Sequence, residues 1–411
     1  MKKDISLKRD KMLKILIVFA LISYIFSIPS FSARSGLVHY APYLFLSGLG
    51  GLVFAFCFLH RGFLGFNIDL RVLSPFLFAF YVSIPTVLFS HVFSGVLTLF
   101  FLAVSYVVLY FSFMIVANKK QSIKIVCFSF LLFAFYFIFH YVANGDLLKL
   151  SNLTSLRFGA YFDNVNAIGV YFLIGLTTSF YLGCSHEKRS DLIFFLIAIL
   201  FFGLGCLTQS RAFFISAILS VLLLFVLFFK NNKKVIVASS VIFSALVISF
   251  FVLPVFSGLR YRFLQMFATL FGDSHEISSI TRVLWQQYAF YLGSRHFLFG
   301  LGYSGFSIFS GVGTYSHGNF FEIFCDFGFL GLVIFHLPFF FLFSSSFKSK
   351  EKTKYLCFSF YLIYAILEFI GMFFYNKEFY VVLSLLSYLS FAKVDFRPFG
   401  RCSMVVSFIR I

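Results

Sequence analysis

The chain has 411 residues, of which 61% are hydrophobic and only 12% are charged. A soluble protein of this length carries about twice that share of charged residues, so the composition excludes an ordinary soluble domain. The basic residues gather in short stretches between apolar segments. The net charge of +18 therefore indicates orientation in a membrane rather than a nucleic-acid partner.

Apolar segments of about 20 residues, the length that crosses a bilayer as a helix, recur along the chain and predict about twelve transmembrane helices. In chain order they are 12–33, 37–59, 72–91, 94–117, 123–143, 165–184, 191–208, 211–229, 235–256, 320–346, 355–375 and 378–392. The first follows a basic N-terminus without a small-residue cleavage site, so we expect an uncleaved anchor. The predicted fold class is an all-α polytopic membrane protein. Helices 1–9 lie in 1–256, a large loop in 257–319 separates helices 9 and 10, and 320–411 carries the last helices and a cytoplasmic tail.

The charge of the connecting segments predicts the orientation of these helices. With the N-terminus in the cytoplasm, most of the 33 Lys and Arg residues fall in cytoplasmic loops, as the positive-inside rule requires. Both termini then lie inside, while 144–164, the turn at 209–211 and 257–319 lie outside. The basic residues that fall outside these cytoplasmic loops are Arg34, Lys149, Arg157, Arg211, Arg260, Arg262, Arg282, Arg295 and Lys377.

The predicted outer surface is rich in arginine. Every outside arginine except Arg34 falls in the three outer segments. A guanidinium keeps its charge and binds two phosphate oxygens at once, so several of them near the outer leaflet would suit a lipid diphosphate. Alternatively, a single arginine here would only extend its charge to the membrane interface. No cysteine falls in the large outer loop and none has metal-binding spacing, so neither a disulfide framework nor a metal site is predicted.

A polar cluster stands where the large loop meets the tenth predicted helix. It reads Ser316-His317-Gly318-Asn319-Phe320-Phe321-Glu322 and continues to Asp326. Ionisable groups in an apolar helix are costly and are candidates for function by default. Asn319, Glu322 and Asp326 follow i, i+3, i+7 spacing and share one helix face. We expect His317 at the cap, with Ser316 or Gly318 allowing the turn. The alternative is a capped helix with a polar seam between helices.

Four segments carry a resemblance when they are taken in order. They are Arg157-Phe158-Gly159 with Asp163-Asn164-Val165-Asn166; Leu207-Thr208-Gln209-Ser210-Arg211; Ser279-Ile280-Thr281-Arg282-Val283-Leu284-Trp285 with Gly300-Leu301-Gly302; and Ser316-His317-Gly318-Asn319 through Gly328 and Gly331. On these segments the chain resembles the O-antigen polymerase and O-antigen ligase family of bacterial envelope glycosyltransferases. All four lie on the same predicted side of the membrane.

The resemblance implies a GT-C-like enzyme of the bacterial inner membrane whose active site faces the periplasm. It implies glycan transfer from an undecaprenyl-diphosphate carrier without a metal, a nucleotide sugar or a cofactor. The implied partners are this carrier-linked glycan, membrane lipids, and a chain-length regulator and flippase of the same pathway.

The same resemblance assigns roles to residues on the outer side. A leaving diphosphate needs fixed cations, and an acceptor hydroxyl needs a base within hydrogen-bond reach. His317 is the candidate base, and Glu322 either orients it or serves as the base instead. The candidates for diphosphate binding are Arg157, Arg211 and Arg282, and the supporting residues are Asn166, Asn319 and Asp326.

Three functions remain open at this point. We favour a polymerase of carrier-linked repeat units, on the look of the Asn-x-Asn segment and the Gly-x-Gly segment. The alternative is a ligase that moves the polymer to lipid A-core. A transporter or flippase of the same lipid-linked sugar would show its polar residues near the membrane midplane, whereas here they crowd one face.

Overall fold

The computed structural model describes residues 2–31, 40–59, 70–116, 118–144, 158, 164–185, 192–229, 252, 257–270, 277–369, 374 and 376–391. Nearly all of these residues are helical, and this part of the chain contains no strand. The helices are α1 (Lys2–Phe31), α2 (Ala41–Leu59), η3 (Leu70–Leu73), α3 (Ser74–Pro85), η4 (Thr86–Ser90), α4 (Phe93–Val116), α5 (Lys119–Ala143), α6 (Val165–Cys184), α7 (Ile193–Leu207), α8 (Arg211–Phe229), α10 (Ser257–Leu270), α11 (Ile277–Arg295), α12 (Gly305–Phe309), α13 (Asn319–Lys348), α14 (Thr353–Glu368) and α15 (Lys377–Phe391). The predicted all-α class is confirmed.

Several of these helices are long and apolar enough to cross a membrane. In the described ranges they are Asp10–Ser30, Phe93–Val116, Lys119–Ala143, Val165–Cys184, Arg211–Phe229 and Asn319–Lys348, with shorter apolar helices at Ala41–Cys57, Ser74–Ser90 and Ile193–Leu207. These agree with the spans expected from hydropathy. The span expected at 235–256 lies outside the described residues except for residue 252. The chain is therefore a polytopic membrane protein.

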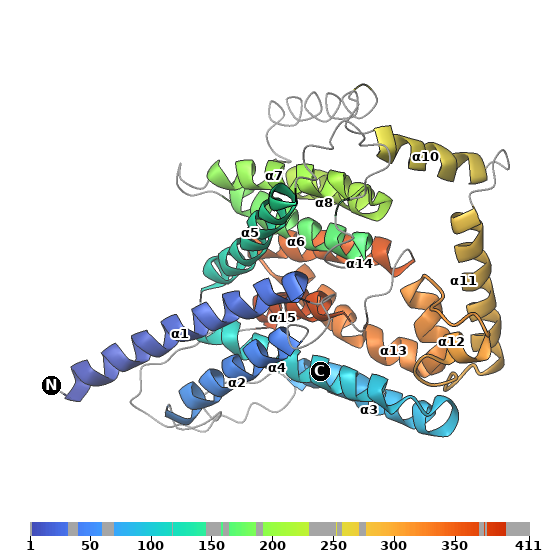
Figure 1. Cartoon of the computed structure of the whole chain (residues 1–411). Helices are drawn as coiled ribbons and strands as arrows, with labels where there is room; N and C mark the ends of the chain where they lie inside the picture. Colours follow the sequence, from blue (N-terminus) through green and yellow to red (C-terminus); the bar gives the residue numbers. More distant parts are fainter. Residues whose placement is uncertain are drawn as a thin grey trace.

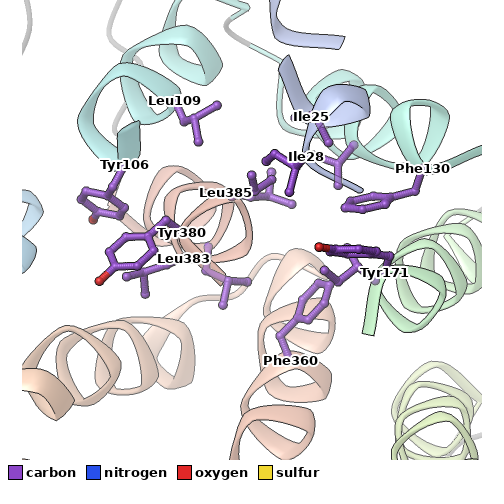
Figure 2. Packing of buried hydrophobic residues seen from close by; sticks show 14 of the residues in the cluster. Ile25, Ile28, Tyr106, Leu109, Phe130, Tyr171, Phe360, Tyr380, Leu383 and Leu385 are labelled. Carbon is purple, nitrogen blue, oxygen red and sulfur yellow. The ribbon is translucent and has the colours of Figure 1, made fainter. Parts of the chain in front are cut away.

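The helices pack around α15, which contacts α1, α4, α5, α13 and α14. Figure 2 shows Ile25 and Ile28 of α1, Tyr106 of α4 and Phe130 of α5 facing Leu385 and its neighbours on α15. Lipid is as apolar as the side chains of this core, so the hydrophobic effect does not drive the helices together. Close packing of rings and hydrogen bonds from small hydroxyl residues hold the core together instead. The buried Tyr106 hydroxyl, for example, lies 2.7 Å from Ser387 Oγ.

The segment at 257–319 is more ordered than the single loop that hydropathy predicted. It contains α10, α11 and α12, and the resembling segment at 279–285 lies inside α11. A search for apolar spans misses α11, because polar residues such as Arg282, Gln286 and Arg295 interrupt its apolar ones. In Figure 1 α10, α11 and α12 lie together at the right, while the N-terminus lies at the left. α11 packs along α13.

A break in α13 lets the segment before α12 dock onto it. Gly328 has φ 67° and ψ −169°, which interrupts the helix. The freed amides of Phe329 and Leu330 donate to the carbonyls of Phe297 and Leu298, at 2.6 and 3.3 Å. A Cβ at Gly328 would stand 2.5 Å from the Leu298 carbonyl, so only glycine fits here.

The helix before the same break anchors the turn at Gly300-Leu301-Gly302. The Leu301 and Gly302 amides donate to the carbonyls of Cys325 and Asp326, at 3.0 and 2.6 Å. On α3 the Tyr81 hydroxyl donates to the Phe327 carbonyl at 2.8 Å. These bonds satisfy backbone groups that a broken helix would otherwise leave unpaired in the membrane. They also fix α11 relative to the start of α13.

Candidate functional site

The start of α13 differs in detail from the expected cap. Gly318 is the N-cap, but its backbone is extended at φ −145° and no side chain caps the helix. The unusual turn lies at His317, which has φ 64°, rather than at Ser316 or Gly318. Gly318 matters for space instead, because a Cβ there would lie 2.9 Å from the Phe321 ring and 3.0 Å from Gln286 Nε2. The positive φ of His317 is uncommon for a residue other than glycine, and such a residue is held in place by its surroundings.

Glu322 holds the His317 turn through the backbone. It is only 2% exposed, and its Oε2 accepts a hydrogen bond from the Ser316 amide at 2.7 Å. The Ser316 hydroxyl donates to the Gly318 carbonyl at 3.3 Å. The carboxylate thus closes the turn that carries His317, and its role in orienting the imidazole remains a prediction. Its role as an alternative base remains a prediction.

Asn319 is fully buried and ties α13 to the end of α14. Its side-chain amide donates to both carboxylate oxygens of Glu368 at 3.1 Å, and its Oδ1 accepts from the Phe374 amide at 3.1 Å. Glu368 also lies 3.3 Å from Nε2 of His336. The His336 Nδ1 faces the Leu332 carbonyl at 2.8 Å, so Nδ1 carries a hydrogen. The sequence alone does not show the pairing of Glu368 with His336, because it depends on how α13 and α14 cross.

The Asp326 carboxylate binds the backbone of the segment before α13 and does not face an open site. Its Oδ1 accepts from the Phe306 amide at 2.8 Å, which places the carboxylate at the start of α12. Its Oδ2 is buried and has no hydrogen-bond partner among the described residues. Asn319, Glu322 and Asp326 are all buried, and each holds a different segment.

His317 lies between aromatic rings and near a guanidinium. Its imidazole is parallel to the Trp285 ring, with centroids 5.3 Å apart and 9° between the planes. The Tyr315 ring lies 4.3 Å away at 56°. Partial burial, and then the charge of Arg282, lower the pKa of His317 to about 4. The imidazole is therefore neutral near pH 7, which a proton acceptor requires, although the low pKa also makes it a weaker base.

Arg211 and Asn166 each stand at the start of a helix. Ser210 Oγ accepts from the Phe213 amide at 3.3 Å, and the Arg211 guanidinium donates to the Arg262 carbonyl of α10 at 3.2 Å. Asn166 donates its amide to Asn164 Oδ1 at 3.0 Å, at the start of α6. Arg157 lies outside the described residues, and its neighbour Phe158 donates its amide to the Leu207 carbonyl at 3.3 Å.

The structure thus brings Arg282, His317 and Glu322 together where α11 meets α13. Arg211 belongs to a neighbouring part at the start of α8, and α10 contacts both α8 and α11. Sequence reasoning missed Trp285, Gln286 and Tyr315 as neighbours of His317, although Trp285 is the only tryptophan in the chain. Within the described ranges no three His, Cys, Asp or Glu residues form a group that could hold a metal ion.

A comparison with protein families finds one match, over the middle of the chain. Residues 193–336, from α7 into α13, match the family model described as O-antigen ligase. This match supports the similarity of the chain to the O-antigen polymerase and ligase family that the four segments indicated. The matched region contains Arg211, Arg282, His317 and Glu322, so it covers three of the four resembling segments. Members of this family are membrane glycosyltransferase-like enzymes, and the family includes both polymerases and ligases. No curated protein matches the chain.

Proposed function

We propose that this protein is an O-antigen polymerase, which joins undecaprenyl-diphosphate-linked repeat units at the periplasmic face of the inner membrane without a metal. The observation that carries this proposal is the meeting of His317 and Arg282 where α11 joins α13, inside the region that matches the family. A neutral imidazole near a guanidinium pairs a proton acceptor with a cation that can bind phosphate. Glycosyl transfer from a lipid diphosphate needs both groups.

The proposed step moves one proton and one electron pair. A sugar hydroxyl on one carrier-linked unit attacks the anomeric carbon of another unit and forms the new glycosidic bond. The bond from that carbon to the diphosphate oxygen breaks, and undecaprenyl diphosphate leaves with the electron pair. His317 accepts the hydroxyl proton, while Arg211 and Arg282 stabilise the charge that develops on the diphosphate. Arg157 is proposed for the same role from the sequence alone.

The second candidate function is that of an O-antigen ligase, which the printed description of the matching family favours. A ligase uses the same donor chemistry, and only its acceptor differs, because the polymer moves to lipid A-core. Both functions therefore need the same arginines and the same base. The residues around His317 could therefore serve either acceptor hydroxyl.

A lipopolysaccharide gel of a strain that lacks this protein separates the two functions. Loss of a polymerase leaves lipid A-core that carries a single repeat unit. Loss of a ligase leaves bare core while the polymer stays on its carrier. We expect core plus one repeat unit. Bare core together with carrier-linked polymer would overturn the polymerase proposal in favour of the ligase, and an unchanged ladder would overturn both.

A further inference from the structure

Two neighbouring residues of α11 contact His317 in different ways. The Trp285 ring lies parallel to the imidazole, with centroids 5.3 Å apart. Gln286 Nε2 donates to the His317 carbonyl at 3.2 Å and to the Phe369 carbonyl at the end of α14 at 3.1 Å. Trp285 therefore contacts the ring, and Gln286 holds the backbone to which the ring is attached.

We propose that Trp285 is a positioning residue, which holds the His317 imidazole so that its nitrogen-bearing edge meets the acceptor hydroxyl, while Gln286 fixes the turn beneath it. This inference rests on the proposed role of His317 as the base. The indole covers one face of the imidazole, and Tyr315 lies against it from a second direction, at 4.3 Å and 56°. An imidazole held in this way has only its edge, which carries the nitrogens, available to accept a proton.

The His317 turn needs such support because its own conformation is unfavourable. With φ at 64°, His317 lies in the left-handed region, which a non-glycine residue keeps only where its surroundings hold it there. The backbone contacts of Gln286 and Glu322 hold the turn from two helices, α11 and α13. They leave the imidazole free to rotate about its side-chain bonds. The stack on Trp285 limits that rotation.

Trp285 also faces the charge that His317 takes up. The groups around the imidazole are Arg282 on α11, Tyr315 in the preceding loop and Glu322 at the base of the turn. Arg282 opposes an imidazolium, whereas the electron-rich face of an indole attracts a cation. Trp285 thus favours the protonated imidazole that forms when the hydroxyl proton is transferred.

The test uses Trp285 as its own reporter, because it is the only tryptophan in the chain. An imidazolium stacked on an indole quenches its fluorescence. In the purified full-length protein we expect a quench as the pH falls, with a midpoint near the lowered His317 pKa of about 4. His317→Gln should abolish this transition. His296→Gln, at the other end of α11 and against Phe89, should leave it in place.

A further variant separates this transition from unfolding at low pH. Arg282→Gln removes a charge that opposes the imidazolium, so the quench should move to higher pH. A transition that persists unchanged in His317→Gln would overturn the inference, because Trp285 would then not sense this imidazole.

Turnover of a synthetic carrier-linked repeat unit supplies the second readout. Trp285→Leu should lower kcat by about 100-fold, as misplacing a catalytic group by about 1 Å does, with little change in KM. Trp285→Phe keeps a flat ring and should retain most of kcat. Low kcat in Trp285→Leu with high kcat in Trp285→Phe would show that the stacked ring is what matters. Normal turnover by Trp285→Leu would overturn the inference.

The two readouts also distinguish the inference from the function on which it rests. Full turnover by His317→Gln, together with a quench that depends on His317, would refute the proposed base while the stacked pair stands. An inactive His317→Gln without any quench that depends on His317 would refute the positioning role alone.

Discussion

Replacing Gly328 by alanine tests whether the break in α13 holds α11 in place. A Cβ at this position would stand 2.5 Å from both the carbon and the oxygen of the Leu298 carbonyl. The conformation at φ 67° and ψ −169° belongs to a region that is essentially restricted to glycine, and it costs another residue about 1–3 kcal/mol. Moving the loop away would weaken the two adjacent backbone hydrogen bonds, each worth about 1 kcal/mol net.

From these terms we expect Gly328→Ala to lower the free energy of unfolding by about 3 kcal/mol. Thermal unfolding in detergent, followed by the fluorescence of Trp285, measures this loss where α11 meets α13. The matched control is Gly203→Ala on α7, where a Cβ meets nothing within 4 Å and alanine favours the helix by up to about 1 kcal/mol. If Gly328→Ala unfolded at or above the wild-type temperature, as the control should, the loop would not depend on this close approach.

Three further predictions concern charge and orientation. Arg211→Ala and Arg282→Ala should abolish polymer on a lipopolysaccharide gel while the protein stays in the membrane, and lysine should restore activity only in part because an ammonium cannot form the bidentate fork. Full activity of Arg211→Ala at normal expression would remove its phosphate role. Glu322→Gln keeps an acceptor for the Ser316 amide and should retain most turnover, whereas Glu322→Leu leaves that buried amide unpaired, at a cost of about 1–3 kcal/mol. Equal damage by Glu322→Gln and His317→Gln would reassign the base to Glu322. Reporter fusions should place residue 290 outside and both termini inside, and a cytoplasmic signal near residue 290 would contradict the mechanism.

The membrane helices were the most predictable part of this fold. The predicted segments 165–184 and 211–229 coincide with α6 and α8, and 94–117 differs from α4 by one residue at each end. Apolar length alone sets these helices, because a bilayer requires it. Apolar length did not predict the helices of 257–319. α11 is stabilised by packing against α13, and its sequence is not continuously apolar.

The candidate site was predictable in its residues but not in its contacts. Spacing placed Asn319, Glu322 and Asp326 on one helix face, and the structure buries all three. It could not show that they bind α14, the His317 turn and the start of α12, because those partners lie far apart in the sequence or depend on a turn. The positive φ of His317 was unexpected for the same reason, since hydrogen bonds from other segments hold it.

The most direct test of the central claim is turnover of purified protein on a synthetic carrier-linked repeat unit. His317 is proposed as the base, so His317→Gln, which keeps hydrogen bonding but not basicity, should lose about 100- to 10,000-fold in rate. Wild-type turnover should be the same with and without EDTA. Near-normal turnover by His317→Gln would contradict the base assignment, and a loss of wild-type turnover in EDTA would contradict the metal-free mechanism.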